Sequence, residues 1–285
     1  MSDREDTEEY DPADILRAAA ARGDDPLDIA ETALAFAAMD RPGVPLTRYR
    51  DILSQITEAV AARVTRFGPD AAPEEKAVQV SQVLAEEFGF AGDSATYDDP
   101  RNANLMLVID RRKGLPVALG ILYIHVARGQ NWWAEGLNFP NHFLIRMRIG
   151  PEQVIVDPFH GGRLMDAPAL RGLIQDMSNG KAELTPAATQ AVSDRQVLLR
   201  LQNNIKLRLY RDERLTEGLA VLERMRLLAP DIHDFQREAG MVNARIGNLG
   251  AAITLLRGYL DHGDGSSAAR HETARVLMDL EKRLN

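Results

Sequence analysis

The stretch from residue 113 to residue 162 constrains the fold of this chain more than any other part of the sequence. Gly114 breaks the preceding helical pattern, and Pro116 precedes the run 117–127, which is almost wholly apolar. A run of this length that is apolar on most sides predicts a buried helix. Three strands are expected after it, at residues 132–137, 142–149 and 153–157. We therefore expect an α+β domain in which this helix packs on a small antiparallel sheet.

Two polar residues stand at the ends of the later strands. His142 opens the middle strand, and Asp157 ends the next one, just before a Gly161-Gly162 turn. A histidine and an acid on neighbouring strands, close to the start of a buried helix, resemble two members of a catalytic triad. The third member would be a cysteine at the helix start, where the helix dipole and the histidine lower the pKa of its thiol. This chain contains no cysteine, so the arrangement predicts architecture rather than activity.

Four motifs lie in and before this stretch: Tyr97-x-x-Pro100-x-Asn102, Arg111-Arg112-Lys113-Gly114-Leu115-Pro116, Asn141-His142-Phe143-Leu144 and Asp157-Pro158-Phe159-x-Gly161-Gly162. Together they resemble the SirB1 family. The SirB1 family comprises bacterial proteins with a transglutaminase-like domain followed by tetratricopeptide repeats. The resemblance extends from about Leu27 to the C-terminus, and it implies a papain-like or transglutaminase-like core.

The resemblance assigns the position of the catalytic cysteine to Pro116. Proline carries no nucleophile, and Leu115 and Val117 beside it carry none either. His142 and Asp157 match the other two positions, so they are the candidate catalytic residues that remain from a triad. We expect their side chains to be hydrogen-bonded to each other and to stabilise the fold, because an unsatisfied buried polar group is costly.

The rest of the chain is expected to be mainly helical. Residues 1–10 are acidic and polar, which predicts a disordered tail. Helices are expected at residues 11–22, from Pro26 to about residue 42, and at 47–68, 73–88, 102–112 and 167–177. We place a transglutaminase-like domain with N-terminal helices at residues 11–180 and a helical repeat domain at residues 190–285. The segment between them is rich in small and turn-forming residues.

The C-terminal segment shows an internal repeat. Shifting the sequence by 34 positions pairs Leu215 with Leu249, Gly218 with Ala252, and Leu222 with Leu256. This shift is the tetratricopeptide period, and residues 268–284 are expected to follow as a capping helix. Two copies are fewer than the three or so that a stable array needs. We therefore expect the segment to dock on the core or to bind a protein or peptide partner.

Arginines give this C-terminal segment a basic component in an acidic chain. They include Arg208, Arg211, Arg224 and Arg226. Two interpretations stay open. The arginines form a binding site for an acidic peptide, or they form a solvated helix face.

The composition argues against several kinds of function. The net charge of -8 disfavours nucleic acid and membrane surfaces as partners, because both attract clustered lysine and arginine. No apolar run approaches the ~20 residues of a membrane span. The acidic start differs from a signal peptide, so we expect a cytoplasmic protein. The absence of cysteine excludes disulfides, thiolate metal sites and thiol catalysis.

Three functions remain open. We favour a non-enzymatic binding or regulatory protein, in which a degenerate core is joined to a partner-binding repeat and no cofactor or metal is needed. The second is a hydrolase or acyltransferase in which His142 and Asp157 activate water or the substrate directly. The third is a metal-dependent enzyme, since His142, Asp157 and His160 are residue types that bind Zn²⁺ or Fe²⁺.

Overall fold

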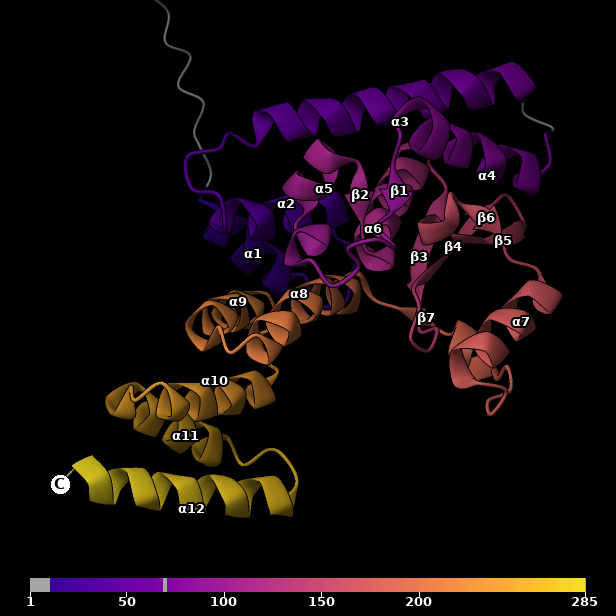
Figure 1. Ribbon diagram of the computed structural model, residues 1–285. Helices are drawn as coiled ribbons and strands as arrows, with labels where there is room; N and C mark the ends of the chain where they lie inside the picture. The colour runs from indigo at the N-terminus through magenta and orange to yellow at the C-terminus, as the bar shows by residue number, and fades with distance from the viewer. Residues whose placement is uncertain (1–10, 69–70, 285) are drawn as a thin grey trace, which may run out of the picture.

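The computed structural model describes residues 11–68 and 71–284 (Figure 1). The predicted acidic tail, residues 1–10, lies outside the described residues. The N-terminal region consists of α1 (Pro12–Ala21), α2 (Ile29–Met39), α3 (Thr47–Phe67) and α4 (Pro73–Ser81), which continues into a π-helical turn, η1 (Gln82–Glu87). In Figure 1, α3 and α4 lie across the top of the molecule, and α1 and α2 lie below α3.

Aspartate side chains set the starts of the first two helices. Asp11 accepts a hydrogen bond from the backbone N–H of Ala13, and Asp28 accepts one from the N–H of Glu31. Such caps satisfy N–H groups that have no partner within the helix. The predicted helix start at Pro26 is therefore wrong, because α2 begins only after the Asp28 cap.

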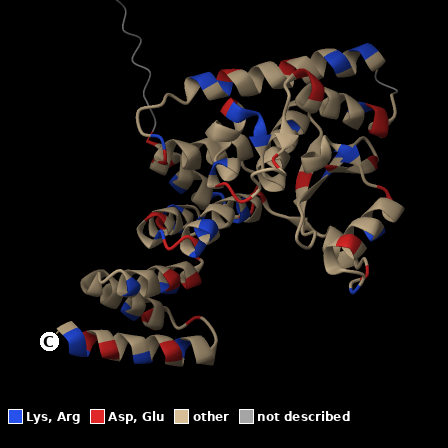
Figure 2. Cartoon of the chain, viewed as in Figure 1, with Lys and Arg blue, Asp and Glu red and all other residues tan. Residues whose placement is uncertain are grey.

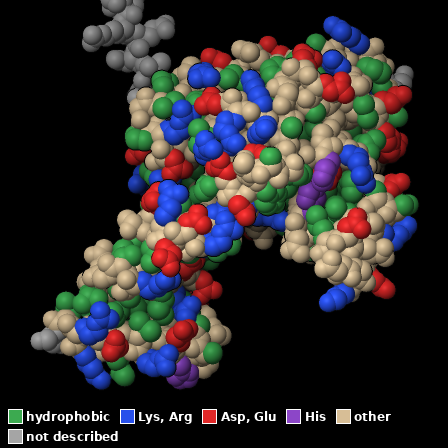
Figure 3. Space-filling view, in the orientation of Figure 1, with side chains coloured by type: hydrophobic (Ala, Val, Ile, Leu, Met, Phe, Trp, Pro, Cys, Tyr) green, Lys and Arg blue, Asp and Glu red, His purple; other side chains and the backbone are tan. Residues whose placement is uncertain are grey.

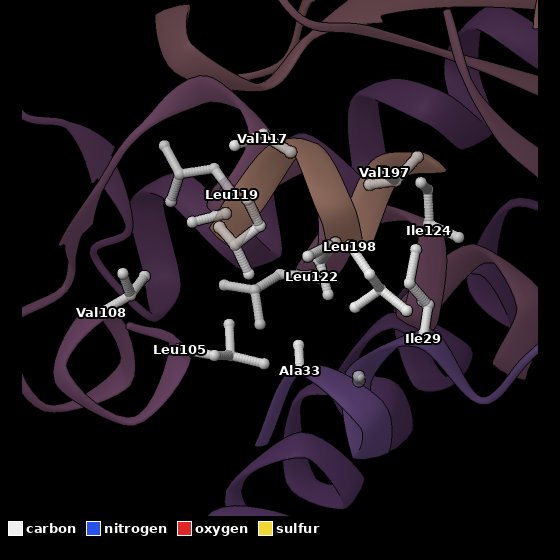
Figure 4. Packing of buried hydrophobic residues seen from close by; sticks show 14 of the residues in the cluster. Ile29, Ala33, Leu105, Val108, Val117, Leu119, Leu122, Ile124, Val197 and Leu198 are labelled. Carbon is white, nitrogen blue, oxygen red and sulfur yellow. The ribbon is translucent and has the colours of Figure 1, made fainter. Parts of the chain in front are cut away.

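The central helix of the core is α6 (Pro116–Gly129), as its apolar sequence predicts. Every residue from Pro116 to Ile124 is buried. In Figure 4, apolar side chains of α6 lie among those of α2, α8 and the helix α5 (Leu105–Arg111). The helix α5 starts later than predicted, because Pro100–Ala103 form a separate 3-10 turn, η2, and Asn104 then caps α5. Helix α6 is thus packed against α2, α5 and α8.

The sheet is antiparallel and has five strands in the order β6-β5-β4-β3-β7. The strands are β3 (Trp133–Leu137), β4 (Leu144–Ile149), β5 (Glu152–Asp157), β6 (Arg163–Leu164) and β7 (Ala191–Val192). Helix α6 packs on one face, and α7 (Ala167–Ser178) shares a second apolar cluster with Leu137 and Leu144. Strand β4 begins two residues later than predicted, so His142 lies in the bend that precedes the strand.

Four short strands were not predicted. Strands β6 and β7 have two residues each, and β7 pairs with β3 although it lies in the segment expected to join two domains. A separate parallel pair, β1 (Ala91–Gly92) with β2 (Lys113–Gly114), ties the loop before η2 to the start of α6. Two residues are too few to show the period of a strand.

The C-terminal segment consists of five helices, which are α8 (Asp194–Arg211), α9 (Leu215–Leu228), α10 (His233–Arg245), α11 (Leu249–His262) and α12 (Ser267–Leu284). In Figure 1, α8 and α9 lie against the core, whereas α10 to α12 form a stack that extends away from it. Gly218 allows close packing of α9 on α8, because a Cβ there would lie 2.3 Å from the ring of Tyr210.

Helix α8 is docked on the core by polar contacts as well as by apolar packing. The carboxylate of Asp194, at the start of α8, lies 2.6 and 2.9 Å from the two terminal nitrogens of Arg128 on α6. The same carboxylate accepts a 2.8 Å hydrogen bond from the N–H of Leu27. Arg195 donates to the carbonyl of Ala20. These contacts join α8 to both the N-terminal helices and the central helix.

The four arginines that suggested a basic site in the C-terminal segment are each paired with an acid of the chain. Arg208 and Arg211 both contact Asp98, while Arg224 pairs with Asp40 and Arg226 with Glu223. In the view of Figure 2, positive and negative side chains are interspersed over the molecule. None of the helices in the described parts of the chain has the length and apolar character needed to cross a bilayer.

Candidate functional site

The position of His142 is fixed by its neighbour in the chain. The ring of Phe143 is buried between two glycines: a Cβ on Gly120 of α6 would lie 2.3 Å from the ring, and one on Gly136 of β3 would lie 2.7 Å from it. The guanidinium of Arg200 on α8 lies over the same ring, 5.5 Å from its centre. Since Phe143 cannot shift, the backbone at His142 is held against α6.

Asp157 is placed by the turn that ends β5. Its Oδ1 accepts hydrogen bonds from the backbone N–H groups of Phe159, at 3.0 Å, and His160, at 3.4 Å. The carboxylate thereby caps a short 3-10 turn, η3 (Pro158–His160), and the two glycines that follow have positive φ angles, as the predicted turn requires.

The structure brings His142 and Asp157 together, as the spacing of the strands predicts. Nε2 of His142 lies 2.9 Å from Oδ1 of Asp157, and both side chains are buried. The direction is poor for a hydrogen bond, however, and Nε2 has no well-aligned partner among the described residues. The two side chains are therefore in contact, but they do not form the well-aligned hydrogen bond that was predicted.

A second histidine, His160, also contacts Asp157. Its Nδ1 lies 2.7 Å from Oδ2 of the carboxylate, and its side chain is 57% exposed. Histidine side chains are visible on this face of the core in Figure 3. Burial by itself raises the pKa of Asp157, but the contacts with His142 and His160 outweigh burial and hold this pKa below its ordinary value.

We expect Asp157→Ala to lower the free energy of unfolding by about 1–3 kcal/mol, because it removes the partner of a buried histidine and the cap of η3. Because the folded state depresses the pKa of Asp157, its carboxylate stabilises the fold above about pH 4, and this stability is lost as the pH falls further. Thermal melting at neutral and acidic pH measures both effects.

The matched control for this prediction is Asp279→Ala, which removes an exposed carboxylate of α12. The control is expected to melt like the wild type, because exposed ion pairs contribute little. If Asp157→Ala and His142→Ala both melt like the control, the two buried side chains do not stabilise the fold, and the interpretation is wrong.

Pro116 occupies the first position of α6, next to a cavity of about 270 Å³. The cavity lies between the start of α6, the bend at His142 and helix α8. Its described lining consists of Tyr97, Leu115, Pro116, Val117, Asn141, His142, Phe143, Arg200, Asn203, Asn204, Leu207 and Arg208. This set contains no thiol, no aliphatic hydroxyl and no lysine, so it lacks the cysteine, serine, threonine and lysine nucleophiles of acyl transfer.

Comparison with known proteins agrees with this geometry. The profile of the transglutaminase-like superfamily matches residues 47–203. The chain belongs to the transglutaminase-like superfamily. The matched region runs from α3 into α8, so it includes Pro116, both members of the His142–Asp157 pair and Arg200.

Curated relatives extend over most of the chain. A UPF0162 protein of Xylella fastidiosa is 28% identical over 240 residues, which cover 83% of this chain and 84% of the relative. A UPF0162 protein of Vibrio cholerae is 28% identical over 66% of this chain and 70% of its own length. Mouse F-box only protein 21 is 28% identical over 44% of this chain and 20% of its own length. No solved structure shows significant similarity.

In this transglutaminase-like core, His142, Asp157 and His160 also form a cluster of metal-ligand types. Their candidate ligand atoms all lie within 4.8 Å of one another. Two histidines and one carboxylate are a ligand set known for Zn²⁺ and Fe²⁺ sites. Here each oxygen of Asp157 already faces one histidine nitrogen, so the same geometry also fits a metal-free network.

Two residues of the site were missed in the sequence. Arg200 and Asn203 line the cavity beside the transglutaminase-like core, but they belong to α8, which the sequence assigned to the C-terminal segment. The apolar stripe of α8 predicts that this helix packs on something. It does not show which polar side chains then face the start of α6.

Proposed function

We propose that this protein is a non-enzymatic binding protein, in which a transglutaminase-like core retains a cleft and lacks the nucleophile. The observation that supports the proposal most strongly is Pro116 at the first position of α6, beside a cavity with no cysteine, serine, threonine or lysine among its described lining residues. In this proposal, His142 and Asp157 are a buried pair that fixes one wall of the cavity. The protein is then a pseudoenzyme that binds a ligand without converting it.

The test is a turnover assay with purified protein. We expect no incorporation of amines into glutamine substrates, and no hydrolysis of peptides or esters above the buffer rate, because covalent acyl transfer needs an activated nucleophile. His142→Ala is the matched variant. Turnover by a contaminant persists in this variant, whereas turnover that depends on His142 and Asp157 disappears. Turnover by the wild type that is lost in His142→Ala contradicts the proposal and favours direct activation of water by His142 and Asp157.

We also propose the finer assignment to the SirB1 family, with a tetratricopeptide-like tail that binds a protein partner. Helices α9 and α11 have equal lengths of 14 residues and start at positions related by the repeat shift. Helices α10 to α12 extend from the core and have a separate apolar cluster that includes Leu256 and Leu280. The partner is expected on these three helices, because α8 and α9 are already docked.

A metal-dependent enzyme is the second candidate function, supported by the His142–Asp157–His160 cluster. If this candidate is correct, Zn²⁺ raises the melting temperature of the wild type, since a ligand that binds only the folded state stabilises it. His160→Asn, which changes a mostly exposed side chain, removes the effect. An equal response of both proteins to Zn²⁺ excludes a site that uses His160.

A further inference from the structure

We propose that the cavity at the start of α6 binds the carboxylate of an apolar ligand, and that Arg200 is the anion-binding residue. The ligand class is an N-acylated apolar amino acid or the C-terminal residue of a peptide, which present the same chemistry. The inference rests on the proposed binding function, because it names the ligand class of that cleft.

The first support is the charge of Arg200 and the partners of its guanidinium. It lines the cavity, and one of its terminal nitrogens donates a 2.5 Å hydrogen bond to the carbonyl of His142. Within residues 11–68 and 71–284, no carboxylate forms an ion pair with this guanidinium, in contrast to Arg208 on the next turns of α8. Burial lowers the pKa of Arg200, yet an arginine remains charged at neutral pH. A partly buried cation without a counterion favours an anionic ligand.

The second support is the set of amides around Arg200. Asn141 and Asn203 also line the cavity, and their side chains make no hydrogen bond to any described residue. Asn141 has a left-handed backbone conformation, with a φ of 55°. Arg200 has four N–H donors left, so a carboxylate can be bound by the guanidinium and by amide groups together.

The third support is the apolar part of the lining. Leu115, Val117 and Phe143 form the buried wall, whereas Leu207 and Tyr97 are 54% and 41% exposed at the rim. Large exposed apolar side chains beside a cavity indicate a surface that a ligand covers. The volume of about 270 Å³ is close to the small end of ligand sites, which hold about 300–1,000 Å³. A single apolar residue with its carboxylate suits this size.

The charge of the cavity decides between ligand classes. The two cationic residues of the lining are Arg200 and Arg208, and no acid is among the described lining residues. Asp98 partly neutralises Arg208, so we expect the cavity to prefer a ligand with one negative charge, placed near Arg200. An uncharged amide of the same shape would leave the guanidinium without a counterion. We therefore expect discrimination between an acid and its amide.

The experiment is calorimetric titration of the full-length protein with N-acetyl-leucine and with N-acetyl-leucinamide. The acid is expected to bind at least about tenfold more tightly than the amide, because the amide cannot form the charge-assisted hydrogen bond. A short peptide that ends in leucine, with a free or an amidated C-terminus, distinguishes the two sources. If the free peptide binds more tightly than N-acetyl-leucine, the peptide end is the natural class.

Three variants make the test specific. Arg200→Gln is expected to remove the preference for the acid. Asn203→Asp keeps the side-chain shape and adds a negative charge, so it is expected to weaken acid binding about tenfold and to leave amide binding unchanged. Arg211→Gln is the matched control, because Arg211 lies on the same helix and is absent from the cavity lining. It is expected to bind like the wild type.

The inference is overturned if acid and amide bind equally, or if neither binds. It is also overturned if Asn203→Asp binds N-acetyl-leucine as tightly as the wild type does. This variant tests the inference even if Arg200→Gln fails to fold. If the proposed non-enzymatic function is wrong, the protein converts the added compound, and this failure is recognised by turnover. Chromatography of the titrated solutions detects hydrolysis of the amide or the peptide, whereas an absent preference without turnover contradicts only the carboxylate assignment.

Discussion

Asp194→Ala is expected to lower the free energy of unfolding by about 3 kcal/mol, and thermal melting or denaturant unfolding measures the loss. The carboxylate of Asp194 is buried and binds both terminal nitrogens of Arg128 and the N–H of Leu27. Removing one partner of a buried pair costs about 3–5 kcal/mol, because the other charge is left uncompensated. We expect the low end of this range, since 26% of the Arg128 side chain is exposed.

This substitution also tests how α8 is attached to the core. Glu281→Ala is the matched control, because it removes the carboxylate of an ion pair with Arg257 that is exposed on both sides. The control is expected to unfold like the wild type. Equal stability of Asp194→Ala and Glu281→Ala would show that the Asp194–Arg128 contact does not stabilise the attachment of α8 to the core.

Gly120→Ala is expected to destabilise the protein by about 2 kcal/mol, although alanine normally stabilises a helix interior by about 1 kcal/mol relative to glycine. The added Cβ would lie 2.3 Å from the ring of Phe143. The ring has little room to move away, because Gly136 also lies close to it, next to its Cζ and Cε2 atoms. Overpacking of this kind forces a shift of the backbone and costs about 1–3 kcal/mol.

The matched control is Gly172→Ala on α7, where an added Cβ meets nothing within 4 Å. This variant is expected to be as stable as the wild type or slightly more stable. A shift of Phe143 in Gly120→Ala would also move His142, so the cavity should lose affinity for its ligand. If Gly120→Ala is as stable as Gly172→Ala, the ring is not confined, and His142 is less rigid than the packing indicates.

The sequence predicted the parts of the fold that have long, periodic patterns. The apolar run after Pro116 is the buried helix α6, and the alternation after residue 142 is the central strand of an antiparallel sheet. His142 and Asp157 were expected side by side because they flank neighbouring strands, and their side chains are indeed in contact. These predictions depend on local patterns and on the pairing of adjacent strands.

Other features depend on contacts between distant residues, which local patterns do not show. Arg200 reaches the carbonyl of His142 across 58 positions of the chain. Strand β7 completes the sheet with only two residues, and its pairing depends on where α8 docks. The shift of His142 from strand to bend follows from the left-handed conformation of Asn141, which the alternation of the next residues conceals. The cavity therefore became visible only in the structure.

The intact mass of the protein after incubation with acyl donors shows whether the cavity carries out covalent acyl transfer. An acyl transferase or hydrolase with a protein nucleophile forms a covalent intermediate, and the described lining of the cavity has no cysteine, serine, threonine or lysine to carry one. We expect an unchanged mass for the wild type and for His142→Ala. An acyl group attached to a residue of the cavity in the wild type, and absent in His142→Ala, would contradict the proposed non-enzymatic function.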